Sequence, residues 1–114
     1  IAGGTGSCCG ITYLQGGGLR EIKYAINNML ATLQGMICDG AKATCALKIA
    51  AGTNCAIQCS TLALADISPT SKDGIIFDDA EETIKNTGRL MREGFAQTDE
   101  AILSIMLAKQ LESK

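Results

Sequence analysis

The chain has 114 residues, of which 46% are hydrophobic and 19% charged, a composition that excludes a disordered chain and indicates one ordinary folded domain. Its 10 basic and 12 acidic side chains give a formal net charge of -2, which provides no general attraction to nucleic acid or an anionic membrane. Because the chain contains no histidine, the commonest general base and every zinc site that needs an imidazole are excluded.

Residue usage predicts an all-α fold. The chain has one proline, two phenylalanines and no tryptophan, and it lacks valine, whereas the residues that favour helices are abundant. We expect residues 1–114 to form a single helical domain, a compact bundle of about five helices. In this bundle a turn broken by glycines carries two cysteines of interest.

The first predicted helix spans residues 4–15 and ends at the glycine run 16–18. Because its residues are apolar or small all round, we expect it to be buried. The uncharged stretches 1–19 and 49–65 are not membrane spans, since the first is rich in glycine and the second in polar residues.

Residues 19–33 form the clearest amphipathic helix. Apolar residues recur at spacings of three and four, and we expect them to face inward while Asn27 and Asn28 face outward with the charged residues.

A turn interrupted by Gly35 and Gly40 follows, and after it we expect a long helix over residues 42–65. The residues of this helix that we expect to face inward are Leu47, Ala50, Ala51, Cys55, Ile57, Ala63 and Leu64.

The tail is predicted to form two packing helices after a loop at residues 68–74. The first begins with the acidic residues 78–82, which complement the helix dipole, and ends at Gly94. The second begins at Thr98.

Six cysteines are the most unusual feature of the composition. Cys8, Cys9, Cys55 and Cys59 lie in helices rich in small residues, where a free cysteine behaves as a compact hydrophobic residue. Cys38 and Cys45 flank the glycine-broken turn and the start of a helix, a setting that favours thiolates, so we interpret these two as cofactor and metal ligands. Their spacing alone matches no known iron–sulfur or zinc pattern.

The residues around this turn carry a resemblance. The sequences GMICDGAK at 35–42 and CALK at 45–48 resemble the signature of the L-cysteine desulfidase family, itself similar to the alpha chain of iron–sulfur L-serine dehydratases. Shorter likenesses occur at 2–6, 10–14 and 26–29, so the resemblance covers nearly the whole chain.

The resemblance implies a [4Fe-4S] cluster and a lyase that eliminates sulfide from L-cysteine, or water from L-serine, to give pyruvate and ammonia without pyridoxal phosphate. It places Cys38 as the central ligand and Cys45 as the ligand that follows. The first ligand would precede Ile1, unless Cys8 or Cys9 replaces it in a different register. The chain end lacks the terminal cysteine of some dehydratases, which favours the desulfidase branch.

Asp39 and Lys42 are our candidates for catalytic residues that orient the substrate or tune the cluster, although a solvated turn explains them equally well. The chain opens without methionine or a charged leader, so we expect the C-terminal fragment of a longer cytoplasmic protein, inactive alone. Its expected partners are a small amino-acid substrate and the missing N-terminal portion, but no nucleic acid and no membrane. The sequence is also compatible with assembly of the chain into a homo-oligomer.

Two alternatives make different predictions about the thiols. A non-catalytic structural module would bury all six cysteines as free thiols and bind no metal. A secreted domain cross-linked by disulfides would contain no free thiols. Because the chain shows no signal segment, this is the least favoured alternative.

Overall fold

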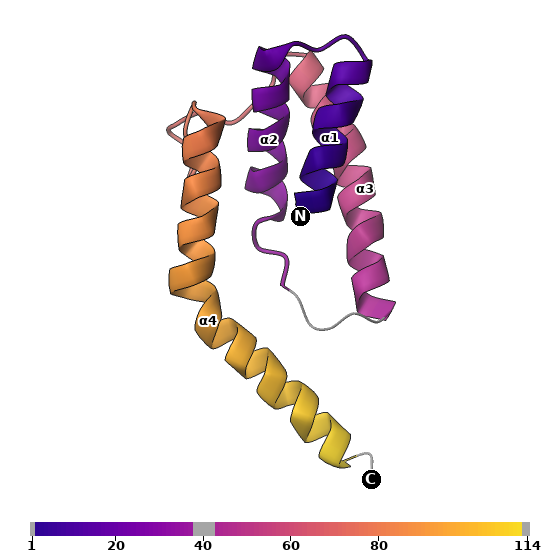
Figure 1. Ribbon diagram of the computed structural model, residues 1–114, viewed down its shortest axis with the longest axis vertical. Helices are drawn as coiled ribbons and strands as arrows, with labels where there is room; N and C mark the ends of the chain where they lie inside the picture. Colours follow the sequence, from indigo (N-terminus) through magenta and orange to yellow (C-terminus); the bar gives the residue numbers. More distant parts are fainter. Residues whose placement is uncertain (1, 38–42, 113–114) are drawn as a thin grey trace.

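The computed structural model describes residues 2–37 and 43–112, and these ranges contain helices and loops but no strand (Figure 1). The helices are α1 (Ala2–Leu14), α2 (Leu19–Leu33), α3 (Ala43–Leu64) and α4 (Ala80–Glu112). The predicted all-α class is therefore confirmed.

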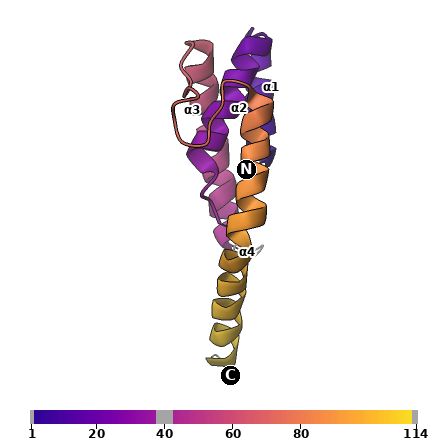
Figure 2. The same ribbon diagram turned by 90° about the vertical axis from the view of Figure 1, so that its left-hand side faces the viewer.

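Helices α1, α2 and α3 pack against one another as a three-helix unit (Figure 1). Among the described helices, α4 packs against α2 alone. Two views at right angles show the second half of α4 continuing past the ends of the other helices (Figures 1 and 2). This half contains several exposed apolar side chains, namely Leu103, Ile105, Met106, Leu107 and Leu111.

The glycine run ends α1 where the sequence predicts. Gly16 has a φ of 94°, a left-handed conformation that glycine adopts without strain. The next residue, Gly17, is buried, and its N–H donates to the Thr12 carbonyl at 2.9 Å. The chain then turns into α2, where the Glu21 carboxylate accepts a hydrogen bond from the Gly18 N–H at 2.9 Å.

The core of the three-helix unit consists mainly of small side chains. Its buried members are Cys8, Ala25, Met29, Cys55, Ala56, Cys59 and Ala63. A Cβ added to Gly4 would lie 3.5 Å from the Gly52 carbonyl oxygen, so α1 and α3 come close to each other at this point. Further along, the buried hydroxyl of Thr12 donates to Ser60 Oγ at 3.0 Å, which links the same two helices.

Helix α2 has the predicted bounds, but the prediction that its asparagines face outward is wrong. Asn27 is 1% exposed and Asn28 is 5% exposed. The Asn27 amide donates to the Phe77 carbonyl at 3.0 Å, and the Asn28 amide donates to the carbonyls of Cys59 and Ile67 at 3.3 and 3.0 Å. Because the segment between α3 and α4 covers α2 on a second side, both amides are buried, and each donates to main-chain carbonyls, as buried amides generally do.

Two further expectations about burial need correction. Tyr13 and Leu14 are 68% and 83% exposed, so α1 is buried along one side only. On α3 the exposed side chains include Leu47 and Ile57, while the buried face is Gly52, Cys55, Ala56, Cys59, Ser60 and Ala63. Helix α3 therefore turns its small residues, rather than its large ones, toward α1 and α2.

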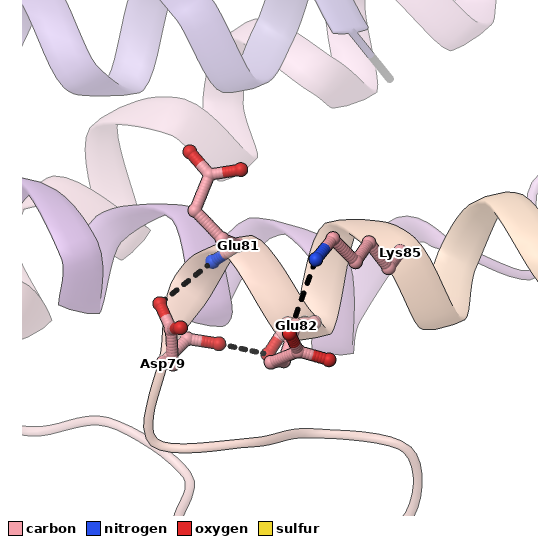
Figure 3. A network of polar contacts seen from close by, with 5 residues as sticks. Asp79, Glu81, Glu82 and Lys85 are labelled. Atoms are coloured by element: carbon pink, nitrogen blue, oxygen red, sulfur yellow. Dashed lines mark hydrogen bonds and ion pairs between the residues drawn. The ribbon is translucent and has the colours of Figure 1, made fainter.

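The start of α4 is organised by the acidic run that the sequence indicates (Figure 3). An Asp79 carboxylate oxygen accepts a hydrogen bond from the Glu81 N–H at 3.1 Å. One turn further, Lys85 forms an ion pair with Glu82 at 3.2 Å. These contacts stabilise the first turn, where negative charge complements the helix dipole.

The expectation of about five helices is wrong for the described residues, which form four. Helix α4 passes through Gly94 and Thr98, where we expected one helix to end and another to begin. One glycine costs a helix only about 1 kcal/mol relative to alanine, and without a proline nearby the flanking helix formers outweigh that cost.

The turn predicted at 34–44 lies only partly within the described residues. None of the helices in residues 2–37 and 43–112 has the length and apolarity needed to cross a membrane.

Replacing Gly17 by alanine tests the tight turn between α1 and α2. The new Cβ would lie 2.7 Å from Thr12 Cγ2 and 2.8 Å from the Thr12 oxygen, so we expect a loss of about 1–3 kcal/mol in the free energy of unfolding. As a control, Gly10→Ala places a methyl group in open space on α1 and should stabilise by about 0.5–1 kcal/mol. Urea unfolding followed by circular dichroism measures both, and equal effects would contradict the assignment of a tight turn.

Candidate functional site

A pocket of about 470 Å³ lies where α1 and α3 begin and α2 ends. This volume is in the range of small-ligand sites. Helix α1 contributes Gly3, Gly4 and Ser7; the end of α2 and the residues after it contribute Leu33, Met36 and Ile37; and α3 contributes Cys45, Lys48, Ile49, Gly52 and Thr53.

Cys45 is the predicted ligand that the structure brings to this pocket. It is half-buried on the first turns of α3. Lys48 and Gly52 follow at positions three and seven residues later, which puts all three on one face of the helix. The other predicted site residues, Cys38, Asp39 and Lys42, lie outside the described residues.

One cationic side chain lines the described part of the pocket. Lys48 is the one charged side chain among its described lining residues, and none of them is acidic. The walls around it combine apolar side chains with the small residues Gly3, Gly4 and Gly52. Such walls leave space for a small ligand.

The cysteines of the helical core differ from Cys45. Cys8, Cys55 and Cys59 are buried, as predicted for compact hydrophobic residues, and the Sγ atoms of Cys55 and Cys59 lie 3.5 Å apart as free thiols. Burial, followed by the hydrogen bond with Cys55, raises the pKa of Cys59 to about 12. Burial, followed by the adjacent Cys9, raises the pKa of Cys8 to about 11.

These raised pKa values keep Cys8 and Cys59 protonated at neutral pH, and a protonated thiol is a poor metal ligand. The pKa of Cys9 is also raised, mainly by burial. The described cysteines thus separate by position into a group packed among the helices and Cys45 at the pocket.

The donor set of the pocket fits part of an iron–sulfur cluster. Within residues 2–37 and 43–112 no group of three or more cysteine and acidic side chains is close enough together to hold a metal ion. Cys45 supplies one thiol donor beside small-residue walls, and Ile37 also lines the pocket. A cluster bound in this pocket would therefore need further ligands from outside the described residues.

Our reading of the sequence missed the residues that surround Cys45. Lys48 and Gly52 could have been found from their helical spacing to Cys45, since both lie on the face that Cys45 occupies. Ser7 carries no such signal, because only the packing of α1 on α3 brings it to the pocket.

Comparison with known proteins adds evidence on ancestry. A family model described as the serine dehydratase alpha chain matches residues 1–104. The chain is 59% identical over 114 residues to a UPF0597 protein of Clostridium perfringens, 48% identical over 110 residues to one of Caldanaerobacter subterraneus and 42% identical over 109 residues to one of Bacteroides fragilis.

These three matches cover 96–100% of this chain but only 26–27% of the length of each relative. The chain thus spans about a quarter of the length of the curated relatives that it matches. No solved structure matches the chain.

The separation between the cysteines predicts different thiol reactivity. In metal-free protein at pH 8, we expect iodoacetamide to modify Cys45 at least about tenfold faster than Cys8 or Cys59, because the last two are buried and protonated. Peptide mass spectrometry over a time course measures the three rates. The difference should disappear in urea, and equal rates in the native state would contradict the separation.

Proposed function

We propose that this chain, which belongs to the serine dehydratase alpha chain family, forms the cluster-binding part of a lyase. The family resemblance drawn from residues 35–48 is confirmed by the family model and by the relatives. Membership of this family indicates a dehydratase-like subunit. The cluster, the substrate and the site residues described next are our proposals.

The observation that supports the proposal most directly is the position of Cys45 in a pocket with small-residue walls. We propose that Cys45 and Cys38 are ligands of a [4Fe-4S] cluster, as the family signature implies. A third ligand would come from elsewhere in a longer polypeptide. When bound, the cluster supplies an iron that lacks a cysteine ligand and acts as a Lewis acid toward the leaving group of the substrate.

The proposed reaction is β-elimination from L-cysteine, with L-serine as the alternative substrate. A base removes the α-proton, the Cβ–S or Cβ–O bond breaks, and sulfide or water leaves. Water then hydrolyses the resulting enamine, after its tautomerisation, to pyruvate and ammonia. The contribution of this chain is to hold a small amino acid between α1 and α3, and Asp39 and Lys42 remain our candidates for orienting it.

We also propose that the rest of a longer polypeptide completes the site. The chain covers 27% of its Clostridium perfringens relative, so nearly three quarters of a protein of that length lies outside it. The second half of α4 has exposed apolar side chains and contacts no other described helix, which is the surface that such a portion would cover. A cytoplasmic location accompanies this proposal, because the cluster ligands must stay reduced.

The alternative is a structural helical module with free thiols. It is favoured by the burial of Cys8, Cys55 and Cys59, which explains these cysteines without any metal. It does not explain why Cys45 faces a pocket with a lysine one turn away, and so we favour the lyase.

Removing the Cys45 thiol tests the proposal. In anaerobically prepared full-length protein, we expect about four iron and four sulfide per polypeptide, and Cys45→Ala should lose most of both together with pyruvate formation from cysteine or serine. Cys9→Ala is the matched control, because Cys9 is half-buried but does not line the pocket. Absence of iron from the unsubstituted protein would support the structural module, and full iron retention in Cys45→Ala would remove Cys45 from the ligand set.

A further inference from the structure

Two buried thiols lie in contact on the core face of α3. Cys55 and Cys59 are 8% and 3% exposed, both are free thiols, and their Sγ atoms are 3.5 Å apart. Neither is among the described residues that line the pocket, and the proposed lyase reaction makes no use of them. We propose that this pair is a site of reversible oxidation, where a low-molecular-weight disulfide converts the two thiols into an intrahelical disulfide that loosens α3 from α1 and α2.

The position of the two sulfur atoms gives the first argument. Residues four apart on a helix are neighbours on one face, and these two side chains turn their sulfur atoms toward each other. A disulfide has an S–S distance of about 2.0 Å, so the sulfur atoms must approach by about 1.5 Å for the bond to form. The two thiols are therefore close enough to react with one another after a small local movement.

The proposed chemistry is an exchange between thiols and a disulfide. The thiolate of one cysteine attacks a sulfur of the small disulfide, whose S–S bond breaks and releases one small thiol. The second cysteine attacks the protein sulfur of this mixed disulfide, so that the mixed S–S bond breaks, the intrahelical S–S bond forms and the other small thiol leaves. Two protein thiols are oxidised, one small disulfide is reduced, and the two protons pass to the released thiols.

Burial determines when this exchange can occur. Both side chains are almost inaccessible while α3 is packed. Burial, followed by the hydrogen bond with Cys55, also raises the pKa of Cys59 to about 12, and exchange requires a thiolate. A local opening of α3 must therefore precede the reaction. The site reacts in the loosened helix and not in the packed one.

The disulfide does not fit the packed helix. Cβ atoms four residues apart on a helix are about 5–6 Å apart, whereas those of a disulfide are about 3.5–4.5 Å apart, so closing the bond bends α3 between residues 55 and 59. The Cys59 carbonyl accepts a hydrogen bond from Asn28 of α2 at 3.3 Å. The next residue, Ser60, accepts one from Thr12 of α1 at 3.0 Å. Bending weakens both contacts, and oxidation therefore holds the helix in the loosened state.

Peptide mapping of the anaerobic full-length protein tests the site. Cleavage by trypsin after Lys48 and Lys72 releases residues 49–72, whose two cysteines are Cys55 and Cys59. With 2-hydroxyethyl disulfide at pH 8, we expect this peptide to become lighter by two hydrogen atoms. The reaction should be at least about tenfold faster in urea below the unfolding transition than in buffer, because urea favours the local opening. Dithiothreitol should reverse it.

Two variants provide matched controls for the mass measurement. Cys55→Ala retains Cys59 but has no partner for it, so residues 49–72 should gain one small thiol and never lose two hydrogen atoms. Cys9→Ala changes a half-buried cysteine on α1 and should react as the unsubstituted protein does.

Amide hydrogen exchange measures the loosening of α3. In the oxidised protein we expect the amides of residues 56–64 to exchange at least about tenfold faster than in the reduced protein, and to return to the slow rate after dithiothreitol. If the disulfide forms but these exchange rates stay the same, the proposed loosening is wrong.

The remaining outcomes concern the pair itself. Two small-thiol adducts on residues 49–72, a link between either cysteine and Cys8, or the absence of any reaction in urea would each overturn the proposal. None of these measurements uses iron or pyruvate formation, so the oxidation site and the lyase function stand or fall separately.

Discussion

The close packing of α1 on α3 is the constraint on which the rest of the structure depends. A Cβ on Gly4 would lie 3.5 Å from the Gly52 carbonyl oxygen, so the two backbones are close at that point, and Thr12 and Ser60 join the helices again by a hydrogen bond of 3.0 Å. Dispersion contacts strengthen steeply as backbones approach, so small residues contribute to stability through proximity instead of size. This contact also brings the start of α1 beside Cys45 and Lys48, and thereby forms the pocket.

The same contact divides the cysteines by their chemistry. Inside it, burial raises the pKa of Cys8 and Cys59 and holds them as neutral thiols, where they fill space between helices. Cys45, nearer the start of α3, lies at the edge of the contact and faces the pocket. A protein that binds a thiolate-ligated cluster gains from this division, since core thiols that remain protonated do not compete for iron.

Much of the fold follows from local features of the sequence. The all-α class, the bounds of α2, the end of α1 just before the glycine run and the acidic start of α4 each depend on neighbouring residues alone. The burial of Asn28 could not be predicted in this way, because its carbonyl partners lie 31 and 39 residues further along the chain. The pocket is another long-range feature: the motif at 35–48 pointed to Cys45, but Ser7 reaches it only through helix packing.

The second half of α4 has exposed apolar side chains, and this surface is related to how the pocket could be completed. A helix with Leu103, Leu107 and Leu111 at 57%, 51% and 74% exposure leaves apolar surface in water, and isolated helices gain little stability without tertiary contacts. The pocket is similarly incomplete as a cluster site, since Cys45 is the one cysteine among its described lining residues. Both features are consistent with the proposal that the chain is part of a longer polypeptide like the relatives, of which it spans about a quarter. Covering α4 and enclosing the pocket would then be coupled, because α4 packs on α2 and the end of α2 lines the pocket.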